Sequence, residues 1–189
     1  MPKLWNDTIA SHRAAVRTVV LDATGAVVAE RGLTGVTMAE VAQRSGIGRA
    51  TLYKYFADVE SILTAWHQRQ VAEHLRQLSE IWERTHRIED VLEAYAFICH
   101  EHPPSEAAAS LHRSAHVDHA RQHLVSFIAD RLVTVRDDVP PKELATYCIH
   151  ALQAAGAVPS KAAVRRLVKV TLDGLGAPAT GRGGGGAGR

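Results

Sequence analysis

Apolar residues recur at helical spacing along almost the whole chain, and this pattern limits the fold more than any other feature. Near the N-terminus, Val16, Val20, Ala23 and Val27 follow a 4, 3, 4 spacing that puts all four on one face of an α-helix. We find no alternation of apolar and polar residues between turn residues, which is the pattern of a β-strand. The sequence therefore predicts an all-α protein.

Residues that begin or end helices divide the chain into segments. Gly32 and Gly35 follow the first helix, and Asp58 is a suitable N-cap for a long fourth helix that runs to about Arg84. Proline pairs at 103–104 and 140–141 cannot continue a helix. Further helices are predicted from Ile88 to the first proline pair, within residues 105–116, from about Leu124 to Asp138, and in two segments that carry Leu144, Cys148, Leu152 and Ala155, and then Val164, Val168, Thr171 and Leu175.

Charge and composition divide the chain into three parts. The net charge is only +2, but residues 1–57 hold seven Lys or Arg against four Asp or Glu, a balance of +3. Residues 58–176 hold thirteen basic against sixteen acidic residues, a balance of −3. A nucleic-acid surface is therefore expected near the N-terminus. We predict a DNA-binding domain over 1–57, a larger helical domain over 58–176, and a disordered Gly-rich tail over 177–189, whose composition cannot bury apolar surface.

Several classes of protein do not fit this sequence. Cys99 and Cys148 stand far apart without metal-type spacing, which argues against a disulfide framework and favours the reducing cytoplasm. There is no signal-peptide pattern, and no segment approaches the roughly 18 uninterrupted apolar residues of a membrane span. We also find no nucleophile with a base, no paired carboxylates and no phosphate-binding loop in a suitable context. We expect neither membrane association nor catalysis, and no required cofactor.

The segment after the first helix has the pattern of a helix-turn-helix. Thr37 and Glu40 form a capping box, in which the threonine hydroxyl accepts from a backbone N–H and the glutamate reaches back. Gly46 permits the left-handed turn that ends this short helix. A third helix follows over about Arg49–Tyr55. Two short helices joined by a glycine turn, at the basic end of a chain, are the arrangement that places a helix in the major groove of DNA.

The residues of this segment closely resemble the N-terminal signature of the TetR family of transcriptional regulators. The likeness rests on Val36–Ala42, Gly46–Gly48 and Thr51–Phe56, and it extends from the first helix to Leu63. It implies about nine helices, with three in a DNA-binding head and the rest in a ligand-binding and dimerisation domain. The implied function is that of a repressor that leaves a pseudo-palindromic operator when a small-molecule effector binds.

The predicted helices of the motif divide into inward and outward positions. Val41, Ile47, Leu52 and Phe56 would hold the helices together, and Ala42 would allow their close approach. Arg49 can form a bidentate pair with a guanine, and Lys54, Tyr55 and Thr37 suit phosphate contacts. Tyr53 matches a DNA-contacting position of the family, although packing under the helix is nearly as well supported. The predicted DNA-binding residues are Thr37, Gly48, Arg49, Ala50, Thr51, Tyr53, Lys54 and Tyr55.

The sequence departs from the family pattern at the start of the fourth helix. Family members usually have a phosphate-binding lysine just before the position of Glu60, and here that residue is Val59. The sequence therefore lacks one residue that would contact the DNA backbone. The backbone N–H groups of that helix start remain as an alternative phosphate ligand.

The resemblance also implies roles for the C-terminal part. The last two helices would pair with those of a second copy, and the stripes between Leu144 and Leu175 have the apolar character that such a homodimer needs. The effector would bind between helices four to seven. The aromatic residues of this region suit such a pocket, but their helical spacing is also typical of plain core. The candidates are Trp66, Trp82, Tyr95, Phe97 and Phe127.

A row of histidines suggests an alternative signal. The chain has eleven histidines, and His112, His116, His119 and His123 have the spacing of one helix face. Such a face can bind Zn²⁺ or a similar metal through neutral imidazoles, which would make the protein a metal-sensing regulator. A solvated histidine-rich surface explains the same residues.

Two further functions remain open at the level of sequence. A nonspecific architectural DNA-binding protein would show weak sequence preference and a more basic chain than this one. A helical protein-interaction adaptor without specific DNA binding would retain the motif only as a structural element, and the loss of the lysine at Val59 fits that function.

Overall fold

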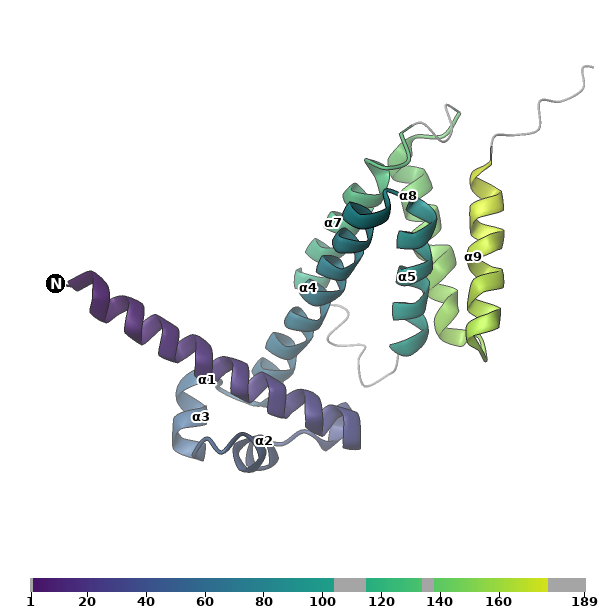
Figure 1. The fold of residues 1–189 in the computed structure, drawn as a ribbon. Helices are drawn as coiled ribbons and strands as arrows, with labels where there is room; N and C mark the ends of the chain where they lie inside the picture. Colours follow the sequence, from purple (N-terminus) through teal and green to yellow (C-terminus); the bar gives the residue numbers. More distant parts are fainter. Residues whose placement is uncertain (1, 104–114, 134–137, 177–189) are drawn as a thin grey trace, which may run out of the picture. The chain divides into compact units, whose positions relative to one another are not determined.

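The computed structural model describes residues 2–103, 115–133 and 138–176. Within these residues the chain forms eight α-helices, two short 3₁₀ helices and no strand (Figure 1). The prediction of an all-α protein is confirmed. The elements are α1 (Pro2–Arg31), η1 (Leu33–Gly35), α2 (Met38–Ser45), α3 (Arg49–Tyr55), α4 (Val59–Thr85), α5 (Ile88–Glu101), α7 (Ala115–Ala129), α8 (Pro141–Gln153), η3 (Ala154–Ala157) and α9 (Lys161–Leu175).

The chain divides into two compact units, and the long helix α4 contributes to both. The first unit contains described residues 2–73 and 115–118, and the second contains 74–103, 119–133 and 138–176. Each unit has its own hydrophobic core. No helix in the described part of the chain is long and apolar enough to cross a membrane.

The core of the first unit is built from one face of α1, both helices of the motif and the first turns of α4. The predicted α1 stripe is confirmed, because Val16, Val20, Ala23 and Val27 are all buried. Val16, Val20 and Val27 belong to one core cluster with, among others, Val41, Leu52, Phe56, Ile62 and Ala65. Complete burial of a side chain of this size contributes about 1.5–3 kcal/mol. This core therefore fixes α2 and α3 against α1, as Figure 1 shows.

The second unit is a bundle in which α5 contacts α8, η3 and α9. Its core includes Leu92 of α5, Ile128 of α7, Ile149 of α8 and Val168 of α9. Ser160 caps α9 by accepting a hydrogen bond from the Ala163 N–H at 3.3 Å. The helices predicted from Ile88 and in the last two apolar segments are confirmed.

The apolar stripes predicted to form a dimer surface have a different role in the structure. Leu144, Cys148, Leu152 and Ala155 are buried in the core of the second unit, as are Val164, Val168 and Leu175, and Thr171 is also buried. The physical reason is that α5 packs on both helices within the same chain. These stripes therefore hold one chain together, and any dimer surface on α8 and α9 must use their outward faces.

The predicted seventh helix was wrong at its C-terminal end. Helix α7 ends at Ala129, and the chain continues in a turn with hydrogen bonds from Arg131 N to Ile128 O and from Leu132 N to Ala129 O, both 3.0 Å long. Leu132 follows this turn and is fully buried, so its spacing from Ile128 is that of a helix although the segment is not helical. The predicted sixth helix, within residues 105–116, and the tail lie almost wholly outside the described residues, since only the first two residues of α7 fall in that range.

Candidate nucleic-acid interface

Helix α2, the first helix of the motif, begins at a threonine cap, as predicted. Thr37 has an extended backbone, and its hydroxyl accepts a hydrogen bond from the Glu40 N–H at 3.1 Å. The predicted return contact from Glu40 is replaced, because its carboxylate pairs with Arg31 of α1 at 3.1 Å. A cationic partner on the neighbouring helix attracts the carboxylate more strongly than a neutral N–H does.

The turn between α2 and α3 depends on a left-handed residue. Gly46 ends α2 with a φ of 69°, a conformation that costs little for glycine and more for other residues. Ser45 stabilises the turn, because its hydroxyl contacts the Ala42 carbonyl and accepts from the Ile47 N–H, both at 3.3 Å. Gly48 is the N-cap of α3, and its carbonyl accepts hydrogen bonds from the Thr51 and Leu52 N–H groups, both at 2.9 Å. The two helices therefore leave the turn in a defined geometry.

Helix α3 buries one side and exposes the other. Leu52 is fully buried and Phe56, which follows the helix, is 3% exposed, so both anchor it in the core as predicted. Tyr53 is 50% exposed, which excludes the alternative of packing under the helix. Tyr55 is half-buried against the core, which makes it the least accessible predicted contact. The predicted contact residues that are exposed are Thr37, Gly48, Arg49, Ala50, Thr51, Tyr53 and Lys54.

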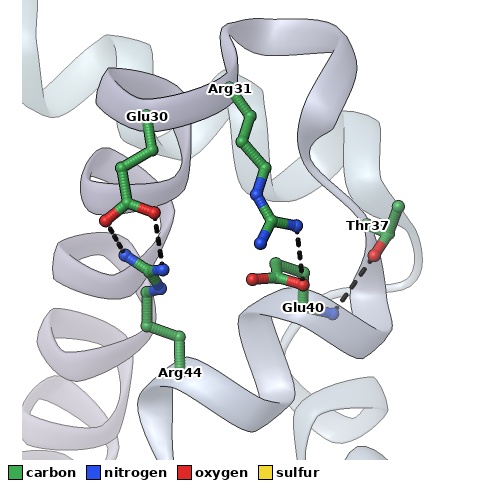
Figure 2. Close-up of polar contacts among 5 residues, drawn as sticks. All are labelled: Glu30, Arg31, Thr37, Glu40 and Arg44. Carbon is green, nitrogen blue, oxygen red and sulfur yellow. Dashed lines mark hydrogen bonds and ion pairs between the residues drawn. The ribbon is translucent and has the colours of Figure 1, made fainter.

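Two ion pairs join the end of α1 to α2 (Figure 2). Arg44 donates to both carboxylate oxygens of Glu30, at 2.5 and 2.7 Å, and Arg31 contacts Glu40. The hydrogen bonds from Arg44 hold the pKa of Glu30 below its usual value. The same contact raises the pKa of Arg44. Arg44 is therefore paired with Glu30, and this ion pair positions α2 on α1.

The start of α4 is closed by its own side chains. Asp58 is the N-cap as predicted, since its carboxylate accepts from the Ser61 N–H at 2.7 Å and its own N–H contacts the Ser61 hydroxyl at 3.3 Å. The predicted alternative phosphate ligand is therefore weakened, because a carboxylate occupies one of the N–H groups and repels an anion. Val59, which replaces the family lysine, is half-buried against the core.

One basic residue near this point was not among the predicted contacts. The Arg17 guanidinium of α1 lies 4.8 Å from the centre of the Phe56 ring, and the side chain remains exposed. It borders an open hollow of about 400 Å³ that is also lined by Asp58, Glu60, Ser61, Thr64, Ala65 and Gln68. The sequence counts Arg17 in the basic excess, but only the fold shows that it stands beside the end of α3.

The predicted ligand-binding aromatics do not form one group. Trp66 belongs to the core of the first unit, where its indole nitrogen faces Gly25 of α1, whereas the other four pack in the second unit. Trp82 and Phe127 are brought together by Arg131, whose guanidinium lies 4.7 and 3.5 Å from their ring centres. Tyr95 is buried, and burial raises the pKa of its hydroxyl. Phe97 borders a separate open hollow of about 270 Å³ between α4 and α5.

The histidine row is described only in part. His112 lies outside the described residues. For His116, only the backbone is described, and it is part of α7. His119 and His123 are neighbours on α7, with their Nε2 atoms 2.9 Å apart. Among the residues that the structure describes, no three His, Cys, Asp or Glu side chains gather in a group that could hold a metal ion.

Comparison with known families supports the identification of the motif. Residues 20–65 match the family model described as bacterial regulatory proteins, tetR family. Two HTH-type transcriptional regulators of Mycobacterium tuberculosis are 31% identical to the chain over 71 residues. That match spans 38% of this chain and 38% of each relative's length. The residues that match the family model thus lie within the first unit.

Solved structures extend the likeness to most of the chain. A TetR-family transcriptional regulator from Streptomyces coelicolor has a TM-score of 0.63 at 15% identity, covering 86% of this chain and 94% of that one. The fatty acid degradation regulator FadR from Bacillus halodurans has a TM-score of 0.62 at 12% identity, covering 82% and 94%. At these identities the likeness shows the fold. Residues 20–65 thus match the N-terminal model of the tetR family, and the described chain shares the fold of regulators of that family.

Proposed function

We propose that this chain is a sequence-specific DNA-binding transcriptional regulator that acts in the cytoplasm without catalysis of its own. The observation that carries the proposal is the two-sided character of α3. Leu52 is fully buried, whereas Arg49, Thr51 and Lys54 are exposed on a helix that the turn at Gly46 orients. A short exposed helix of this kind, at the basic end of the chain, suits the major groove.

The proposal assigns different tasks to the exposed side chains. Arg49 would read a guanine by a bidentate contact, and the absence of side-chain bulk at Gly48 and Ala50 would let the start of α3 approach the bases. Lys54 and Thr37 would contact phosphates. Arg17 is added to this set, because its guanidinium stands beside Phe56 at the end of α3. It would supply a backbone contact that Val59 cannot.

We further propose that the protein is a homodimer formed through α8 and α9. The outward faces of these helices expose Tyr147 and Val170, which are 47% and 64% accessible in the single chain. Exposed apolar side chains of this size on neighbouring helices are suited to an interface between two copies. A dimer would present two α3 helices to half-sites about 34–36 Å apart, or a related spacing.

The finer proposal is that the protein is a repressor and that a small molecule releases it from its operator. Its support is the match of residues 20–65 to the tetR family model, together with a second helical unit that has a separate core. The effector would bind within that unit. Trp82 and Phe127, on either side of Arg131, are the best-placed candidates of the predicted ligand residues.

The experiment that tests the proposal is binding of the purified protein to DNA from upstream of its own gene. Fluorescence anisotropy is measured at two salt concentrations, with an unrelated duplex as competitor, and protection mapping follows. Saturable binding that survives the competitor, with one protected palindrome, is expected. Equal loss to either duplex with diffuse protection would favour the architectural protein, and no protection would favour the adaptor.

A further inference from the structure

His119 and His123 form a close pair on the exposed side of α7. They are four residues apart in the helix, and their Nε2 atoms are separated by 2.9 Å. The ring centres are 4.4 Å apart, and the ring planes are inclined at 82°. Both side chains are exposed. The two nitrogens that can bind a metal ion therefore lie next to each other at the protein surface.

The helix that carries the pair is held in place from its other side. Leu124 and Ile128 of α7 are buried in the core of the second unit. The backbone positions of the two histidines are therefore set before any ion binds. A pre-formed pair loses less conformational freedom on binding than two independent side chains do.

The spacing of the two nitrogens is close to that of two imidazole ligands on one divalent ion. A divalent ion such as Zn²⁺ holds an imidazole nitrogen at about 2.0–2.1 Å, so two ligands at a right angle have nitrogens roughly 2.9 Å apart. Two ligands at the tetrahedral angle would have nitrogens roughly 3.4 Å apart. The observed 2.9 Å equals the right-angled spacing, and it is also the length of the hydrogen bond that the pair forms without metal. Right-angled nitrogen ligation is typical of Cu²⁺ and Ni²⁺.

We propose that His119 and His123 form a two-point binding site for a tetragonal divalent metal ion, Cu²⁺ or Ni²⁺, on the surface of α7. Among the described residues, no third protein ligand groups with the pair. The affinity would be modest, because only two protein ligands hold the ion. Without metal, one ring donates a hydrogen bond to the other.

The test titrates the full-length protein with NiCl₂ by calorimetry and with CuCl₂ by electron paramagnetic resonance. In the wild-type protein, one Ni²⁺ should bind at this site more tightly than any Ni²⁺ bound by the remaining histidines. Nitrogen couplings in the copper spectrum should show two imidazole ligands. His119→Gln and His123→Gln should each weaken this site by about tenfold or more, because the second contact of a chelating pair is intramolecular.

His150→Gln is the matched control. His150 is an exposed helical histidine whose Nδ1 contacts the Thr146 carbonyl at 2.8 Å, and its loss should leave the titration unchanged. Circular dichroism establishes that all three variants keep their helices. Unchanged metal affinity in either α7 variant, or a preference for Zn²⁺ over Ni²⁺ and Cu²⁺, would overturn the proposed site. Absence of any tight site would show that the pair is only a hydrogen-bonded contact.

Discussion

The exposed side of α3 carries residues of two chemical kinds. Arg49, at the N-terminal end of the helix, has a planar fork of donors that can match one base edge. Lys54, in the last turn, is a point charge that suits any phosphate. Neither side chain is used in an ion pair within the described residues, unlike Arg44, which is bound by Glu30. The difference in chemistry predicts different consequences when each is removed.

Arg49→Ala should reduce discrimination at one base pair of each half-site by about 1–3 kcal/mol, because alanine cannot donate the bidentate pair to guanine. Lys54→Ala should weaken binding to all duplexes alike and lower the slope of log affinity against log salt by about 0.9 for each phosphate that the protein no longer neutralises. Both are measured by anisotropy on the operator and on single-base variants. Equal losses on every sequence for Arg49→Ala would remove its role in readout.

Arg17→Ala provides a second comparison for backbone contacts. Its effect should resemble that of Lys54→Ala. Binding to all duplexes should weaken alike, and log affinity should depend less steeply on log salt, because the Arg17 guanidinium lies beside Phe56 at the end of α3 and is assigned a phosphate contact, not a base contact. Arg69→Ala is a matched control, since Arg69 already pairs with Asp22 at 2.8 Å. An unchanged salt slope in Arg17→Ala would show that this arginine only packs on the ring.

The pKa of Glu30 should be measurably depressed. Hydrogen bonds from Arg44 stabilise its charged form, so the pair adds stability above the ordinary carboxyl pKa, and this is lost as the pH falls through the lowered value. Carboxyl carbon NMR should place the Glu30 pKa below the usual value of about 4.3. Arg44→Gln should return it towards that value. A Glu30 pKa that does not respond to this change would contradict the contact.

At the scale of single elements, the turn between α2 and α3 determines how α3 is presented. Gly46 and Gly48 flank Ile47, but only Gly46 has a positive φ, of 69°. Gly48 has a φ of −56°, and a Cβ added there would meet no atom within 4 Å. The two glycines therefore differ in what they require of the backbone.

Gly46→Ala should lower the free energy of unfolding by about 1–2 kcal/mol, because alanine is strained in the left-handed region. Gly48→Ala should leave the free energy of unfolding nearly unchanged. Urea unfolding followed by circular dichroism measures both values. An equal loss in the two variants would mean that the left-handed geometry is not the cause.

Much of the element structure could be predicted from local signals. Thr37, Gly46 and Asp58 mark helix ends through contacts that span only a few residues, and all three act as predicted. Contacts between distant segments could not be predicted in this way. Glu40 pairs with Arg31 instead of returning to Thr37. Helix α7 ends at Ala129, because Leu132 reaches the core through a turn that keeps the same spacing as a helix.

At the scale of the whole molecule, apolar spacing shows which side of a helix is buried but not what covers it. The stripes on α8 and α9 were expected to face a second copy, yet α5 covers them within the chain. The aromatic candidates were likewise predicted as one set, but Trp66 lies in the core of the first unit. Which segment covers a given apolar face depends on packing between parts of the chain that are far apart in sequence. Apolar periodicity within one helix carries no information about that packing.

The dimer proposal predicts the effect of a charge on the outward face of α9. Val170→Glu should convert the protein to a monomer and weaken operator binding, because a carboxylate would be buried without a partner at the interface. Val133→Glu is the control, since Val133 is similarly exposed, at 61%, and lies outside α8 and α9. Sedimentation velocity and anisotropy measure the two effects. A Val170→Glu protein that remains dimeric would place the interface elsewhere.

The division of α3 into a buried and an exposed side also bears on how such a protein can diverge. Leu52 and Phe56 carry the packing, whereas Arg49, Ala50 and Thr51 contribute nothing to the core. Substitutions at the exposed positions therefore leave stability almost untouched. Descendants of one gene can change the operator they recognise, a few side chains at a time, while the scaffold that presents those side chains stays intact.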